Sequence, residues 1–426
     1  MLKLHRAWLV AAVTFVALVG AAGFRATPGV LMNPLHAEFG WSMGTISAAV
    51  SVNLALYGLT SPFAAALMER FGIRRVVSVA LLVVAVGSGL TVFMTASWQL
   101  VLCWGVLVGL GTGSMALAFV ATVTSAWFVK HRGIVTGVLT AGSAAGQLVF
   151  LPLLASIAGS VGWRIAALTV AGAALVVVPL VAWLLRDRPE EIGLLAYGAT
   201  KPQPRAVITV GAGRRAVQVL ASAARTRNFW LLAAGFAICG ATTNGLVGTH
   251  FIPAAMDHGM GETAAASLLA LVGVFDIVGT IFSGWLTDRV DSRVLLGAYY
   301  GLRGLSLFTL PSLFAGSTHP SMLVFIVFYG LDWVATVPPT VALCRRYYGA
   351  AGPIVFGWVF ASHQIGAAFA AVAAGLVRDQ LGNYDLAWYI AGLLSCFAAL
   401  LSLLMLATRA APTPRVALSV RHEAVS

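Results

Sequence analysis

Long apolar stretches recur along the whole sequence. A helix needs about 20 mostly apolar residues to cross a bilayer, and we mark twelve stretches of suitable length: residues 8–34, 43–68, 75–95, 98–127, 134–158, 163–185, 229–255, 263–287, 293–314, 320–343, 353–377 and 385–408. Only 9% of the residues are charged, whereas soluble proteins contain about 25%. The sequence therefore predicts an all-α, multi-pass membrane protein surrounded by lipid.

Basic residues lie mainly on one side of this predicted protein. Of 26 Lys and Arg, we place 22 at the chain ends or in loops of one side, and the exceptions are Arg25, Arg164, Arg303 and Arg378. This is the positive-inside bias of an inner-membrane protein whose N and C termini are both cytoplasmic. The net charge of +12 does not indicate nucleic acid, because no soluble basic domain carries it.

A polar segment at 186–228 separates six predicted spans from six. It is rich in Arg, Pro and Gly, which is typical of a solvated cytoplasmic linker. We divide the chain into an N-terminal six-helix bundle at 1–185, this linker, a C-terminal six-helix bundle at 229–410 and a cytoplasmic tail at 411–426.

The two halves repeat one another. Glu69 and Asp288 follow the second and eighth spans at a separation of 219 positions, and Gly137 and Gly357 lie in the fifth and eleventh spans at a separation of 220. Matches at nearly the same offset predict a duplicated six-helix unit.

The charged turns of this repeat resemble the loop motif G-x-x-x-D-R-x-G-R-[RK] of the major facilitator superfamily. The copy at 65–75 has Ala and Glu in place of the first Gly and the Asp, and the copy at 284–293 lacks the later Gly. The resemblance implies twelve helices in two pseudo-repeats, a site near the membrane midplane and alternating access. The residues that we expect to form a cytoplasmic gate are Glu69, Arg70, Arg74, Asp288 and Arg289.

Within that superfamily, the chain is most similar to the monocarboxylate porters and their oxalate-carrier relatives. The stretch 29–42 resembles that group's entry into helix two, G-V-x-x-x-x-L-x-x-E-F-x-x-S, and Arg25 is close to the place of the group's basic residue in helix one. Asp276 matches the acid of the group's eighth-helix pattern F-x-D-x-x-x-R, although Thr280 replaces the Arg. The resemblance implies a small organic anion as substrate.

Charged side chains within apolar spans cost about 2.5–3.5 kcal/mol on insertion scales, so they indicate function. Asp276 and Asp332 are our candidates for proton coupling, and a fixed ion pair with Arg303 is the alternative for either. The candidate substrate ligands are Arg25, Asn53, Tyr57, Gln147, Asn244, His250, Arg303 and His363. A core role remains open for the two histidines, and a position at the outer interface remains open for Arg25.

We find no GxSxG, HExxH or Walker motif. We therefore expect no enzyme activity and no cofactor or metal. The prediction is a monomeric secondary transporter that moves a small, monocarboxylate-like anion by alternating access with protons. A proton-coupled exporter of drugs or metabolites and a transporter-like membrane sensor are the alternatives.

Overall fold

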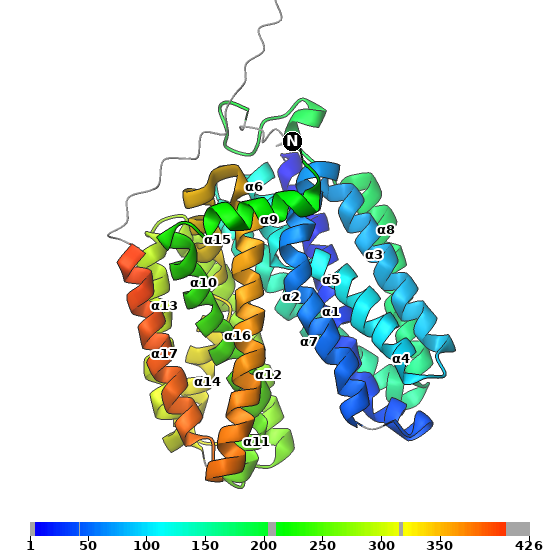
Figure 1. Cartoon of the computed structure of the whole chain (residues 1–426), viewed down its shortest axis with the longest axis vertical. Helices are drawn as coiled ribbons and strands as arrows, with labels where there is room; N and C mark the ends of the chain where they lie inside the picture. The colour runs from blue at the N-terminus through cyan, green and yellow to red at the C-terminus, as the bar shows by residue number, and fades with distance from the viewer. Residues whose placement is uncertain (1–4, 42, 203–209, 315–317, 406–426) are drawn as a thin grey trace, which may run out of the picture.

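The computed structural model describes residues 5–41, 43–202, 210–314 and 318–405, without the side chains of 25–30, 32–33, 43–44, 47, 151 and 262–263. This part of the chain is almost entirely helical (Figure 1). The elements before the linker are α1 (Arg6–Phe39), α2 (Met43–Phe71), α3 (Ile73–Leu90), η1 (Thr91–Phe93), α4 (Ser97–Leu100), η2 (Val101–Val108), α5 (Gly109–Ser114), α6 (Leu117–Trp127), α7 (Arg132–Ser160) and α8 (Trp163–Leu184).

The remaining elements belong to the linker and to the second half. They are η3 (Pro189–Ile192), α9 (Ala212–Ala223), α10 (Arg227–Gly240), η4 (Ala241–Val247), α11 (Gly248–Asp257), α12 (Glu262–Thr287), α13 (Ser292–Thr309), η5 (Leu310–Leu313), α14 (Pro320–Asp332), α15 (Val337–Tyr348), η6 (Gly349–Ala351), α16 (Gly352–Leu381) and α17 (Asp385–Leu404). Two of these elements, η2 and η4, are wound as π-helices, which are rare and often lie at functional sites.

Ten stretches of the described residues are long and apolar enough to cross a membrane. One of them, Pro320–Leu381, is 62 residues long and contains α14, α15 and α16. Helix α13 is not among the ten, because Arg293 and Arg303 lower its hydropathy.

The two halves form two helical bundles that lie side by side (Figure 1). The linker helix α9 crosses one end of them and packs against both α2 and α16. The bundles touch at this linker end and diverge toward the opposite end (Figure 1). The principal contacts between the halves are α7 with α12 and α2 with α16.

The repeated glycines lie at these contacts between the halves. A Cβ atom on Gly137 of α7 would be 2.5 Å from the Thr280 carbonyl oxygen of α12, and one on Gly357 of α16 would be 2.6 Å from Cα of Pro62 in α2. Only glycine permits such close approach of two helices. The offset of 220 in the sequence thus corresponds to two equivalent contacts in space.

The tenth predicted span is broken in the middle. Helix α14 ends at Asp332, residues 333–336 form turns, and α15 begins just before Pro338 and Pro339. Proline lacks a backbone N–H and cannot continue the hydrogen-bond pattern of the preceding turn. The break leaves carbonyl groups available to side chains of neighbouring helices.

Candidate functional site

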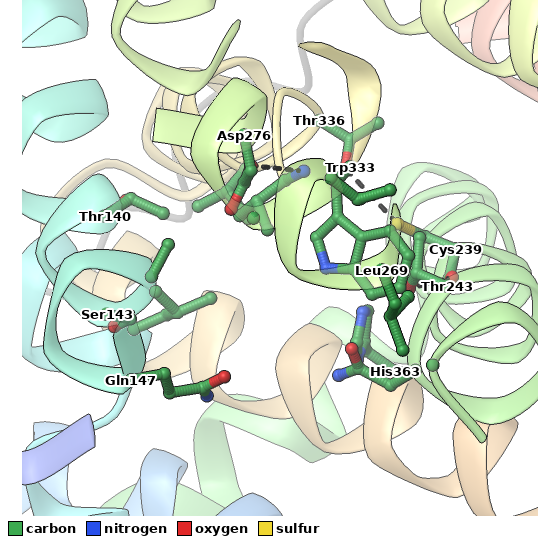
Figure 2. A pocket seen from close by; sticks show the side chains of 18 of the residues that line it. Thr140, Ser143, Gln147, Cys239, Thr243, Leu269, Asp276, Trp333, Thr336 and His363 are labelled. Atoms are coloured by element: carbon green, nitrogen blue, oxygen red, sulfur yellow. Dashed lines mark hydrogen bonds between the residues drawn. The ribbon is translucent and has the colours of Figure 1, made fainter. Parts of the chain in front are cut away.

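A cavity of about 580 Å³ lies between the two bundles, within the range of about 300–1,000 Å³ that is usual for ligand pockets. Helices of both halves supply its walls. Figure 2 shows Thr140, Ser143 and Gln147 of α7 on one side, opposite Trp333 and His363. The lining side chains that carry polar groups are Tyr57, Thr140, Ser143, Gln147, Cys239, Thr243, Asn244, Asp276, Trp333, Thr336, His363 and Gln364.

Five of the residues predicted from the sequence line this cavity: Tyr57, Gln147, Asn244, Asp276 and His363. They come from α2, α7, η4, α12 and α16, so the fold brings together positions far apart in the chain. Arg25 is part of α1, but its side chain lies outside the described residues.

Asp276 is the one carboxylate among the described residues that line the cavity. It is 3% exposed, and its Oδ1 accepts hydrogen bonds from the Thr280 hydroxyl (2.8 Å) and from the backbone N–H of Val334 (3.0 Å). Thr280, which stands where the group pattern has Arg, therefore bonds directly to the acid. Asp276 has no ion pair of 4.0 Å or less with any described residue.

Arg303 is fully buried and is bound to Asp332 rather than to Asp276. Its Nε donates to Oδ2 of Asp332 (2.6 Å), and its Nη2 donates to the carbonyls of Asp332 (2.7 Å) and Trp333 (3.2 Å). Its Nη1 donates to Sγ of Cys239 (3.0 Å). Neither Arg303 nor Asp332 lines the cavity.

Asp276 and Arg303 therefore hold the break in the tenth span from two sides. Asp276 accepts from the N–H of Val334, while Arg303 donates to carbonyls at the end of α14. These hydrogen bonds fix the backbone on both sides of Trp333, whose indole lines the cavity. Sequence reasoning missed Trp333, although the nearby Pro338 and Pro339 signalled an interrupted helix.

Two other residues that were predicted to bind substrate, Asn53 and His250, form hydrogen bonds within the protein instead. Asn53 is buried and donates its side-chain amide to the carbonyl of Trp104 in the π-helix η2 (2.7 Å). His250 contacts the Ala371 carbonyl through Nε2 (2.8 Å) and the Tyr384 hydroxyl through Nδ1 (3.3 Å). Neither residue lines the cavity.

At the linker end, polar contacts join the two halves directly. Asp288, which follows α12, accepts hydrogen bonds from the backbone N–H groups of Gly133 (2.7 Å) and Ile134 (3.1 Å) at the start of α7. A carboxylate at a helix N-terminus satisfies unpaired donors and complements the helix dipole. Arg345 of α15 donates to the Ser125 carbonyl of α6 (3.0 Å). Separation of the halves at this end must break these bonds.

The first charged turn makes different contacts from the second. Glu69 accepts from Arg215 of the linker helix α9, with a closest N–O distance of 3.3 Å. The backbone N–H of Arg74 donates to Asp187, at the start of the linker (2.7 Å). The linker therefore contributes to the packing of this turn.

The other two predicted gate arginines lie over aromatic rings. The guanidinium of Arg70 is 5.1 Å from the centre of the Phe71 ring, and that of Arg289 is 4.1 Å from the centre of the Trp285 ring. Of the five predicted gate residues, Asp288 is the one whose side chain, within the described contacts, forms hydrogen bonds from one half to the other. Sequence reasoning did not identify Arg345.

Two arginines outside the positive-inside pattern are neutralised by acids. Arg164 bonds to Glu38 (2.6 Å), and Arg378 bonds to Asp257 (2.8 Å). Both pairs are partly exposed, so each contributes little stability. Each pair nevertheless cancels a positive charge away from the linker end.

Comparisons with known proteins agree with this architecture. The model of the Major Facilitator Superfamily matches residues 13–352 and 244–424. The chain is 27% identical to an MFS-type transporter of Bacillus subtilis (strain 168), YcxA, over 88% of this chain and 90% of that protein. It is 28% identical to monocarboxylate transporter 13 of Rattus norvegicus, over 90% of this chain and 85% of that protein.

Solved structures show the same fold at low sequence identity. The proton:xylose symporter XylE has a TM-score of 0.69 and 14% identity, over 92% of this chain and 94% of that one. FucP in the outward conformation has a TM-score of 0.69 and 17% identity, over 94% of this chain and 99% of that one.

Proposed function

Because this chain belongs to the Major Facilitator Superfamily, whose members are transporters and not enzymes, we propose that it moves a small organic anion across the inner membrane together with protons. The substrate is a carboxylate of the monocarboxylate type. The observation that carries this proposal is a buried carboxylate, Asp276, on the wall of a cavity between two repeated bundles.

The coupling proton binds to Asp276. Both hydrogen bonds that this side chain accepts go to Oδ1, which leaves Oδ2 for a proton. Arg303 is occupied by Asp332, so Asp276 has no close cation to offset its charge among the described residues. A second negative charge in the cavity is then costly, and substrate anion and proton enter together.

Arg25 attracts the anion in this proposal. A guanidinium remains charged and binds a carboxylate through two parallel hydrogen bonds. Arg25 belongs to α1, which packs against α7, the helix that lines the cavity with Thr140, Ser143 and Gln147. The similarity to monocarboxylate transporters supports the same class of substrate.

The protein alternates access by rocking its two halves. We propose twelve spans, obtained from the ten apolar stretches by dividing Pro320–Leu381 at η6, between α15 and α16, and by adding α13. With a cytoplasmic linker and cytoplasmic termini, the contacts of Asp288 and Arg345 close the inner end. The cavity then opens outward, and breaking those contacts exposes it to the cytoplasm. The transporter acts as a monomer.

Transport by the purified protein in liposomes tests this proposal. Uptake of a panel of labelled monocarboxylates is measured with an imposed inward proton gradient and with none. We expect the gradient to accelerate uptake of at least one acid. Equal uptake with and without the gradient, by protein that is folded, would contradict proton coupling.

Export of drugs or metabolites on the same fold remains the second candidate. The apolar part of the cavity wall, which includes Phe236, Leu269 and Phe360, favours it. Deletion of the gene distinguishes the two functions: an exporter mutant becomes sensitive to toxic compounds, whereas an uptake mutant fails to grow on its acid.

A further inference from the structure

The uncharged polar groups of the cavity identify the substrate more closely. We infer that it is a polyhydroxylated carboxylate of sugar-acid size, with hydroxyl groups along most of its carbon chain. This inference rests on the proposed transport of a carboxylate, and it adds that the hydroxyl groups are recognised as well as the carboxylate.

A row of polar side chains on α7 forms one wall. Thr140, Ser143 and Gln147 are separated by three and four positions, so they lie on one face of the helix. Figure 2 shows all three beside the cavity. The Thr140 hydroxyl is buried and has no hydrogen-bond partner among the described residues. A buried hydroxyl normally has a partner, and a ligand in the cavity would supply one.

The facing wall also carries uncommitted polar groups. Within the described contacts, no hydrogen bond is formed by the side-chain amides of Asn244 and Gln364 or by the indole N–H of Trp333, and all three residues line the cavity. An amide both donates and accepts, and an indole donates. The two walls together therefore offer donors and acceptors spaced across the cavity.

This arrangement matches several hydroxyl groups better than an aliphatic chain. A hydroxyl both donates and accepts, so each substrate hydroxyl can bond to an amide or to another hydroxyl of the wall. An aliphatic acid would leave these groups without partners and would exclude water from them, which is unfavourable. A site built for substrate hydroxyls discriminates strongly against analogues that lack them.

The charge and the size of the cavity restrict the substrate further. The described lining residues include no Lys or Arg, and the carboxylate of Asp276 is among them. The described lining groups that can bind the substrate are therefore mainly uncharged, and they add to the attraction between Arg25 and the carboxylate proposed above. A three-carbon acid would fill only a small part of about 580 Å³, and a six-carbon acid would fill more of this volume.

Three probes of similar length separate the contributions of carboxylate and hydroxyl groups. Gluconate has both, hexanoate has the carboxylate alone, and sorbitol has the hydroxyls alone. Binding to the purified full-length protein is measured by calorimetry at one pH. We expect gluconate to bind at least tenfold more tightly than either of the others.

The outcomes distinguish this inference from the proposed function. Hexanoate binding as tightly as gluconate would overturn the inference and leave carboxylate transport standing. Sorbitol binding as tightly as gluconate would count against carboxylate recognition itself. Failure of all three probes to bind folded protein would refute the inference, while uptake of other monocarboxylates would still support the proposed function.

Variants test whether the polar wall carries the preference. Thr140→Val keeps the shape and removes the unpartnered hydroxyl, so we expect gluconate to bind about two- to tenfold more weakly, with hexanoate unchanged. Thr112→Val is the control, because Thr112 is also buried but lies outside the cavity, and its hydroxyl already donates to the carbonyl of Val108, four residues earlier (2.8 Å). If Thr140→Val weakened both acids equally, Thr140 would have no role in hydroxyl recognition.

Discussion

Replacing Asp332 by Asn tests whether the Arg303–Asp332 pair holds the fold. Arg303 is fully buried and only 7% of the Asp332 side chain is exposed. The substitution leaves the Arg303 guanidinium buried without a counter-ion, although the Asn amide oxygen can still accept a hydrogen bond from it. Breaking one partner of a buried pair costs about 3–5 kcal/mol, because the remaining charge is uncompensated. We expect Asp332→Asn to lower the free energy of unfolding by this amount.

A double-mutant cycle measures the interaction energy between Arg303 and Asp332 apart from the effect that each substitution has on its other contacts. The Arg303→Met variant removes the counter-ion of Asp332 and the donors to the carbonyls at the break of the tenth span. The double variant Arg303→Met with Asp332→Asn buries no unpaired charge, so its cost should be less than the sum of the single costs by about 2 kcal/mol.

Unfolding of the purified protein in mixed micelles with increasing SDS, followed by circular dichroism, measures these differences. Additive effects, or a loss below about 1 kcal/mol for Asp332→Asn, would refute the assignment of this pair to stability. Asp332 would then return as a candidate for proton coupling.

Two further predictions concern the linker end. Asp288→Ala removes the acceptor at the start of α7 and should weaken the contact between the halves by about 1 kcal/mol; distances between spin labels on α7 and α12 should shift toward a separated linker end, and an unchanged distribution would contradict a gating role. Asp291 caps α13, and hydrogen bonds from the Arg293 guanidinium hold the pKa of Asp291 well below its ordinary value. Asp291→Ala should cost about 1 kcal/mol at pH 7. Because the folded-state pKa is lowered, the stabilisation is present above the unfolded pKa of about 3.9 and is lost as pH falls through the folded value; a cost that stayed constant from pH 7 to pH 3 would argue against an ionised cap.

The sequence was sufficient to predict the repeat, because it reflects local packing requirements. Gly137 and Gly357 occupy equivalent contacts between helices, and such contacts accept only the smallest residues. The separation of 220 positions between these two glycines is therefore visible in the sequence itself. Asp288 could likewise be identified from the sequence, because it lies in the charged turn at 284–293 that resembles the superfamily loop motif.

The sequence could not predict which polar residues face the cavity. Asp276 and Asp332 both lie in the middle of apolar spans, and the rotation of each helix decides that the first lines the cavity and the second bonds to Arg303. Trp333 reaches the cavity through a break whose direction depends on side chains of α12 and α13. These relations arise only when helices from different parts of the chain pack together.

Counterflow and gradient-driven uptake by the Asp276→Asn variant test the central claim most directly. The variant mimics the protonated acid, so our account predicts that exchange of labelled for unlabelled substrate continues in liposomes while accumulation driven by a proton gradient is lost. Wild-type protein should show both activities. Gradient-driven accumulation by Asp276→Asn at the wild-type level would contradict the account.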